Sequence, residues 1–264
     1  MELIEEAAEI IFQERTTGSL VQALPAPLAL KSERIAYEIQ DLVHQKMAEA
    51  GAGPVSGYKI GCTTKVMQEF LSIDQPCAGS MNECQLLESG ARFSASNYIK
   101  PAIECEIAVI VGEDIRGGAN EISEQMVADS VAGVLAAIEY VDDRYDDFSS
   151  LGVNRLIADD FFNVASIAGE ARQAWQDLDL RSLKGRGYVN GSLIGEGFGR
   201  DILGHPLNAL LWLANKLAER GKYLKAGDRV TLGSVVETYW VNAGEHIIVE
   251  FDGLAPVELF VDLN

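Results

Sequence analysis

Hydrophobic residues near the start of the chain recur at three- and four-residue intervals, which is the spacing of one face of a helix. This spacing predicts a first helix over residues 3–13. A second helix is predicted to begin after Ser32, whose hydroxyl can cap the first turn, and to end at Gly51. The most regular helix is predicted to start at Pro206 and to end at Gly221.

Further along the chain, short runs of apolar residues alternate with polar ones, as in half-buried strands. Strands are predicted over residues 56–64, 103–111, 229–232, 247–251 and 257–261, with a hairpin turn at Asn190-Gly191. A helix capped by Ser123 is predicted to run through Val131 and Leu135 into the segment before Arg144, and residues 74–79 are predicted to form a loop. Short strands mixed with a few helices, without regular βαβ alternation, indicate an α+β fold.

The length of 264 residues suits one large domain with a small additional region. We expect an N-terminal helical region over residues 1–54 and a larger domain over residues 55–264. The 40 acidic and 21 basic side chains give a formal charge of −19. A surface of this charge repels nucleic acid and anionic membrane, so neither is an expected partner.

The four cysteines show no C-x-x-C pairing and no histidine at zinc-finger spacing, so they are expected to be reduced thiols. The acidic start argues against a signal or transit peptide, and no apolar run approaches the length needed to span a membrane. We therefore expect a soluble cytoplasmic protein.

The predicted strand over residues 103–111 carries the clearest candidate chemistry. Side chains alternate between the faces of a strand, so Glu104 and Glu106 share one face and an unbroken apolar row takes the other. Two carboxylates at this spacing repel each other unless a positive group lies between them, and hard divalent cations bind carboxylate oxygens. The alternative is a solvated outer strand face, which antiparallel sheets often have.

Two more charged residues lie in unusual surroundings. Lys59 has apolar neighbours between two glycines, and burial would lower its pKa unless an anion compensates. The alternative for Lys59 is a side chain that reaches solvent from a strand edge. Glu139 ends an apolar run, where an acid needs a partner, and the alternative to a site role is an ion pair with Arg144.

The order of these residues resembles the 2-keto-4-pentenoate hydratase branch of the fumarylacetoacetate hydrolase superfamily. The matching segments are Gly57–Gly61, Glu104–Ala108, Glu139 with Asp142 and Arg144, Ile157–Asp159, His205-Pro206, Trp212–Leu217, Ala226–Asp228 and Gly233-Ser234. They are collinear over nearly the whole chain.

The resemblance implies a fold of layered, rolled mixed sheets and an assembly into homo-oligomers. It implies that Glu104, Glu106 and Glu139 bind Mg²⁺ or Mn²⁺ and that Lys59 is catalytic. It also makes residues 55–264 the catalytic domain.

Three further residues are candidate substrate contacts: Thr63, Asp159 and Ser234. The hydroxyls of Thr63 and Ser234 can donate hydrogen bonds to substrate, and the alternative is that they only terminate strands. Asp159 can position water or ligand, and a capping or turn role is the alternative.

The chain departs from its relatives on the substrate side. Cys77 stands where the relatives usually carry an acid, and Phe161-Phe162 replace small residues. Residues 235–237 lack a threonine often seen there.

The resemblance implies a hydratase that adds water to a 2-hydroxy-2,4-dienoate, giving a 4-hydroxy-2-oxoacid, in the breakdown of aromatic compounds. The alternatives are a 4-oxalocrotonate-type decarboxylase, an acylpyruvate hydrolase of the same fold, and a non-catalytic protein that binds an oxoacid.

Overall fold

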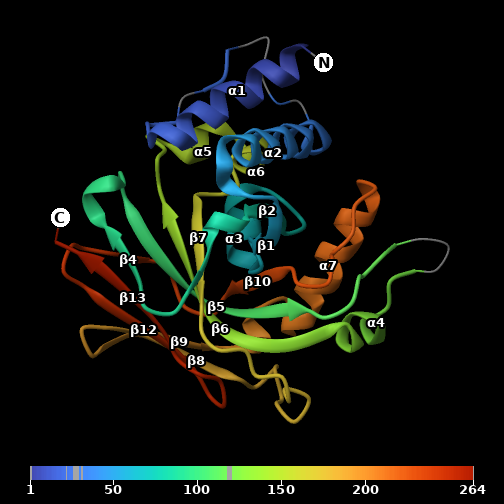
Figure 1. Ribbon diagram of the computed structural model, residues 1–264, viewed down its shortest axis with the longest axis vertical. Coiled ribbons are helices and arrows are strands. Elements are labelled where there is room, and N and C mark those ends of the chain that lie inside the picture. The colour runs from blue at the N-terminus through green and yellow to red at the C-terminus, as the bar shows by residue number, and fades with distance from the viewer. Residues whose placement is uncertain (1, 22, 26–29, 31, 118–120, 264) are drawn as a thin grey trace.

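The helices within residues 2–47 and 148–158 gather at one end of the protein (Figure 1). The computed structural model describes residues 2–21, 23–25, 30, 32–117 and 121–263. Helix α1 (Glu2–Thr17) buries the apolar face predicted from its spacing, and α2 (Glu33–Met47) begins at Ser32, whose hydroxyl accepts a hydrogen bond from the Ile35 amide. These two helices pack on each other and on α6 (Val153–Ala158), next to the short helix α5 (Phe148–Leu151).

A large mixed sheet forms the centre of the protein, with the strand order β2-β1-β10-β5-β6-β7-β3 and β11 paired to β5. Its strands are β1 (Val55–Gly61), β2 (Cys77–Asn82), β3 (Leu86–Glu88), β5 (Pro101–Val111), β6 (Val131–Asp142), β7 (Asn163–Ala168), β10 (Arg229–Ser234) and β11 (Tyr239–Trp240). The smaller sheet has the order β4-β13-β12-β8-β9. Its strands are β4 (Ala91–Ser94), β8 (Lys184–Val189), β9 (Ser192–Phe198), β12 (His246–Phe251) and β13 (Val257–Asp262).

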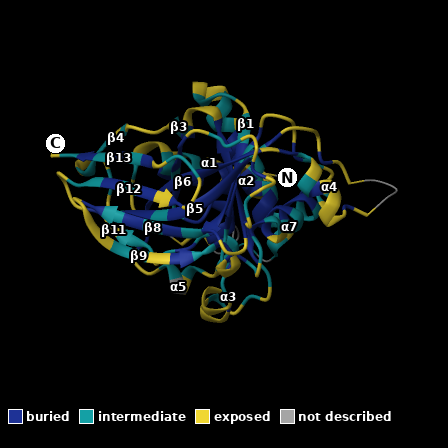
Figure 2. Cartoon of the chain, turned by 90° about the horizontal axis from the view of Figure 1, so that it is seen from below, coloured by how far each residue is buried: buried dark blue, intermediate teal, exposed yellow. Residues whose placement is uncertain are grey.

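The apolar row predicted for β5 is buried in the main core, as Figure 2 shows for the central strands. A side chain at Gly187 of β8 would meet the Cys105 sulfur at 2.8 Å. The two sheets can therefore approach closely at this point because residue 187 is glycine.

Several local predictions are confirmed. Asn190-Gly191 joins β8 and β9 in an antiparallel hairpin, and α7 (Pro206–Glu219) starts at the predicted proline. Short helices α3 (Lys65–Leu71) and α4 (Glu124–Asp129) follow their capping residues Thr64 and Ser123. The α+β class is also confirmed, whereas the boundary at residue 54 stays a prediction.

The helix predicted to continue from Ser123 toward Arg144 is wrong beyond Asp129, because the chain continues as strand β6. Val131 and Leu135 are four residues apart, which places them on one side of a helix and equally on one face of a strand. The continuous apolar run is typical of a strand whose two faces are both buried, and nearly every residue of β6 is buried. Its two edges pair with β5 and β7.

The loop predicted over residues 74–79 is also wrong in its second half. Cys77 begins β2, and it lies opposite Gly61 of β1. Among the helices of the described residues, none is long and apolar enough to cross a membrane.

Candidate functional site

The pairing of β5 with β6 brings the three candidate acids together. Glu104 lies directly opposite Glu139 in the antiparallel register, and Glu106 is two residues along the same face of β5. Ligand oxygens of the three carboxylates lie within 4.8 Å of one another. Glu106 and Glu139 are buried, each about 1% exposed, so the reading of this strand face as merely solvated is wrong.

Each carboxylate receives a hydrogen bond from a different neighbour. Thr238 Oγ1 donates to Glu104 Oε1 (2.7 Å), the Gly233 amide donates to Glu106 Oε2 (2.9 Å), and Asn163 Nδ2 donates to Glu139 Oε1 (2.8 Å). These bonds orient the acids. The second oxygen of Glu139 is buried and has no hydrogen-bond partner among the described residues.

Lys59 lies on β1, which pairs with β10 in the large sheet. Its Nζ lies 3.2 Å from Glu139 Oε1 and donates a hydrogen bond to the Phe161 carbonyl, also at 3.2 Å. The residue is 4% exposed, so the solvent-reaching alternative is wrong. Burial alone would lower the pKa of Lys59, but Glu139, Glu104 and Glu106 outweigh burial and raise it.

The electrostatics of the triad fit a divalent cation. Burial raises the pKa of Glu104 and of Glu106, and repulsion by Glu139 raises both further. When all three acids are ionised, the single ammonium of Lys59 leaves two negative charges without a counter-charge. Hard cations such as Mg²⁺ take this donor set, and the unpartnered Glu139 oxygen faces no competing donor.

A cavity of about 530 Å³ opens beside Lys59 and Glu104. Much of its wall is apolar, including Val66, Met67, Val141, Phe148, Leu156, Phe161, Phe162 and Trp240. The charged residues on the wall are Lys59, Glu104, Asp143, Asp201 and Glu237. Lys59 is therefore the one cation among the described lining residues.

Thr63 and Ser234 both line this cavity, and their role as substrate contacts stays a prediction. Gly233 has a φ of +135°, and a side chain there would meet Thr63 Oγ1 at 2.5 Å. Because residue 233 is glycine, Thr63 can pack against it while the Gly233 amide donates its hydrogen bond to Glu106. The Ser234 hydroxyl donates to the Val236 carbonyl (2.7 Å) and accepts from the Cys105 amide (3.1 Å). It therefore also links β10 to β5.

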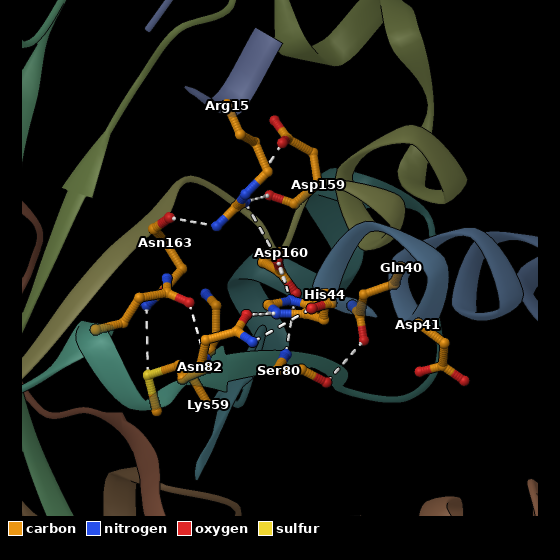
Figure 3. Close-up of polar contacts among 12 residues, drawn as sticks. Arg15, Gln40, Asp41, His44, Lys59, Ser80, Asn82, Asp159, Asp160 and Asn163 are labelled. Carbon is orange, nitrogen blue, oxygen red and sulfur yellow. Dashed lines mark hydrogen bonds and ion pairs between the residues drawn. The ribbon is translucent and has the colours of Figure 1, made fainter. Parts of the chain in front are cut away.

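Asp159 lies away from the cavity. Its carboxylate is fully buried and accepts hydrogen bonds from Arg144 (2.7 and 2.8 Å) and from the Tyr145 hydroxyl (2.6 Å), with Arg15 close by (Figure 3). These cations lower the pKa of Asp159 against the opposing effect of burial. Arg144 therefore pairs with Asp159, and the alternative pairing of Arg144 with Glu139 is wrong.

Sequence reasoning missed Asn163 and Thr238, the two side chains that orient the acids. Neither follows a recognisable spacing from its acid, since Thr238 lies 134 positions from Glu104. Cys62 was also missed as a cavity residue. Hydrogen bonding to the Cys77 thiol lowers the pKa of Cys62, so these two cysteines act on each other beside the cavity.

The curled mixed sheets and the carboxylate triad, two of whose members are buried, define an α+β protein with a candidate divalent-metal centre. Residues 65–261 match the family model of the fumarylacetoacetate hydrolase C-terminal region, and the chain belongs to that family.

Relatives of two activities are similar to this chain. It is 31% identical over 222 residues to a 4-oxalocrotonate decarboxylase of Pseudomonas putida, with 84% of this chain and 83% of that protein covered. It is 29% identical over 253 residues to 2-keto-4-pentenoate hydratase 1 of Dechloromonas aromatica, with 96% and 95% covered. The structure of 4-oxalocrotonate decarboxylase from Pseudomonas putida G7 with magnesium and adipate superposes with a TM-score of 0.91 at 25% identity, covering 98% and 97%.

Proposed function

We propose that this protein is a divalent-metal-dependent hydratase that adds water to a 2-hydroxy-2,4-dienoate with an uncharged, apolar chain end. The observation that carries the proposal is the composition of the cavity wall. One cation, Lys59, lies beside the acid triad, and the wall beyond it is mostly apolar or acidic. The reactive end of the substrate would bind at the triad, and its hydrocarbon end would lie against the aromatic side chains.

Glu104, Glu106 and Glu139 are the residues that would hold the ion, either Mg²⁺ or Mn²⁺. When bound, such an ion supplies Lewis acidity that stabilises negative charge on a 2-oxo or 2-hydroxy oxygen. The donor bonds from Thr238, Gly233 and Asn163 keep the three carboxylates in place for it.

Lys59 would bind the carboxylate of the substrate. In the metal-free protein the three acids raise the pKa of Lys59, so the side chain enters the site as a cation. Thr63, on the same wall, would donate a hydrogen bond to substrate. The apolar wall shields the chain end from bulk water, and the added water supplies the proton and the hydroxyl of the 4-hydroxy-2-oxoacid.

The decarboxylase relative makes 4-oxalocrotonate the main competing substrate. That molecule brings a second carboxylate, and burying a charge without a partner is costly. Beyond Lys59, the charged residues among the described lining residues are acids: Asp201 and Glu237 would repel a second carboxylate, while Asp143 is paired with Lys100 (3.2 Å). An uncharged chain end avoids both the burial of an unpaired charge and the repulsion by acids. This favours a dienoate, and hydration, over 4-oxalocrotonate.

The test is a substrate panel with Mg²⁺ or Mn²⁺: 2-hydroxypenta-2,4-dienoate, 2-hydroxyhexa-2,4-dienoate, 4-oxalocrotonate and an acylpyruvate. Loss of dienoate absorbance with formation of the 4-hydroxy-2-oxoacid is expected. Faster CO₂ release from 4-oxalocrotonate, or cleavage of the acylpyruvate, would replace hydration by that reaction. No turnover of any panel member would point to a protein that binds an oxoacid.

A matched pair of variants ties the activity to the triad. Glu106→Gln removes one charge from the candidate metal centre and should abolish metal-dependent turnover. Glu196→Gln is the control, because Glu196 pairs with Lys184 on the partly exposed strand pair of β8 and β9. Equal activity in both variants would remove the triad from the mechanism. Light scattering of the same samples tests the expected homo-oligomer.

A further inference from the structure

Three consecutive residues next to the cavity have left-handed backbone angles. The φ values of Asp160, Phe161 and Phe162 are +56°, +49° and +68°. Non-glycine residues rarely adopt this region, and a run of three is held only when the surroundings determine it. The turn formed by residues 160–162 therefore needs an external support.

The N-terminal helices supply much of that support, as Figure 3 shows. Asp160 is fully buried, and its Oδ2 lies 2.8 Å from His44 Nε2 on α2 and 3.1 Å from Arg15 on α1. Its Oδ1 accepts a hydrogen bond from the Ser80 amide of β2 (2.9 Å). Arg15 also donates to the Asp159 and Asn163 carbonyls, at 2.8 and 3.2 Å, on the two sides of the turn.

His44 is itself held on its other side. Its Nδ1 contacts Asn82 Oδ1, while the Asn82 amide nitrogen donates to the Gly53 carbonyl (2.7 Å). The two ring nitrogens thus face side-chain oxygens of Asn82 and Asp160. The ring is a rigid link between β2 and the carboxylate of Asp160.

The turn places three groups of the candidate site. The Phe161 carbonyl accepts the hydrogen bond from Lys59, and the Phe161 and Phe162 rings form part of the cavity wall. Asn163, the next residue, donates to Glu139. The direction of Lys59 and of one candidate metal ligand depends on the geometry of this turn.

We infer that Asp160, clamped by Arg15 and His44, is a positioning residue for the reaction, and that the N-terminal helices complete the active site through it. The inference rests on the proposed function, because it takes Lys59 and Glu139 as working residues. Arg15 and His44 lie outside residues 65–261, the segment that matches the family model. A version of the chain without its first helices would keep the triad but lose the clamp.

Asp160→Asn tests the inference with little change in size. The new amide oxygen can still accept from Ser80, but its NH₂ group replaces the oxygen that faces Arg15 and His44. Asp41→Asn is the matched control, since Asp41 is also on α2 and pairs with Arg220 (2.6 Å) and Lys222, away from the turn. We expect kcat/KM for the dienoate to fall at least about tenfold in Asp160→Asn, and to be unchanged in Asp41→Asn.

A second measurement reports on the surroundings of Lys59, and the melting temperature of the same variant reports on its stability. Acetylation of Lys59, followed by mass spectrometry on folded protein, should speed up several-fold in Asp160→Asn relative to the partly exposed Lys46 of the same molecule. This readout needs no substrate, so it tests the inference even if the wild-type protein turns over no dienoate. A variant with a lowered melting temperature but wild-type kcat/KM and wild-type Lys59 labelling would overturn the inference.

A second pair of variants tests the clamp independently, in case Asp160→Asn folds poorly. Arg15→Gln removes the positive charge. Arg15→Lys keeps the charge but lacks the guanidinium group that donates to the carbonyls on both sides of the turn. We expect lower kcat/KM and faster Lys59 labelling in Arg15→Gln, with part of both effects reversed in Arg15→Lys. Wild-type behaviour of Arg15→Gln in both measurements would refute the clamp.

Discussion

Replacing Lys59 by methionine separates the two effects that this side chain has on the candidate metal centre. Methionine keeps an unbranched chain of similar length and removes only the ammonium, which lies 3.2 Å from Glu139 Oε1. The change leaves three acids together with no cation beside them. It should therefore destabilise the metal-free protein and lower turnover while leaving the capacity to bind a divalent cation.

The size of the destabilisation follows from the pair distance. Two unit charges 3.2 Å apart attract by about 5 kcal/mol at an effective dielectric constant of roughly 20. Breaking a buried pair by removing one partner costs about 3–5 kcal/mol. A loss of about 4 kcal/mol lowers the melting temperature of a protein of this size by roughly 10 °C.

The sign of the effect on metal binding is opposite. Without the ammonium, the three carboxylates attract a divalent cation more strongly, so the affinity of Lys59→Met for Mn²⁺ should equal or exceed that of the wild type. Turnover should nevertheless fall by about two orders of magnitude or more, because the substrate carboxylate loses its cation. A saturating ion should restore much of the lost melting temperature.

The assays are thermal unfolding of metal-free and Mn²⁺-loaded protein, calorimetric titration of Mn²⁺, and dienoate turnover, all at about pH 8, where carboxylates with raised pKa values are more fully ionised. Lys46→Met is the control, because Lys46 pairs with Glu9 on the surface. It should change none of these quantities measurably. Wild-type turnover in Lys59→Met would refute the role of Lys59, and loss of Mn²⁺ binding would refute the charge argument.

Four further predictions concern the acids and thiols of the site. Glu106→Gln should lose metal binding and turnover while keeping a native circular dichroism spectrum, and retained Mn²⁺ binding would contradict the ligand assignment. Thr238→Val removes the donor to Glu104 (2.7 Å) and should weaken Mn²⁺ binding by about 10-fold or more, which calorimetry would show; unchanged affinity would refute the orienting role. Because Glu104 and Glu106 have raised pKa values, their protonated forms stabilise the metal-free protein at low pH, and this stability is lost as pH rises through those pKa values. The increase in melting temperature on adding Mn²⁺ should therefore grow with pH, and an increase that shrinks would contradict this linkage. The Cys77 thiol lowers the pKa of Cys62 by hydrogen bonding, whereas burial raises the pKa of Cys84, so iodoacetamide should label Cys62 with an inflection at lower pH than Cys84; the reverse order would refute the thiol contact.

Local patterns in the sequence predicted most of the elements correctly. Capping at Ser32 and Ser123, the Asn190-Gly191 turn and Pro206 at a helix start depend on interactions within a few residues, so they can be read without the fold. The extension of the helix beyond Asp129 failed because the distinction between α4 and β6 depends on what covers the chain. Pairing of β6 with β5 on one edge and with β7 on the other decided it, and the local spacing did not.

The identity of the candidate acids was predicted from their chemistry and from the family resemblance. Local patterns did not predict that the three carboxylates lie close together. Glu104 and Glu106 share a strand face by periodicity alone. Glu139 joins them only because β6 pairs with β5 in the register that places Glu139 opposite Glu104, and a shift of one residue would have turned it away.

By itself, the sequence determined the local elements, the negative charge, the shared face of Glu104 and Glu106 and the family resemblance. These properties depend on residue type and short-range spacing. The tertiary structure decided which distant groups serve the acids: Lys59 beside Glu139, Thr238 on Glu104, and the clamp of Arg15 and His44 on Asp160. It also moved Asp159 from a candidate substrate contact to a buried ion pair with Arg144. Long-range contacts of this kind follow from sheet register and helix packing, which no local pattern contains.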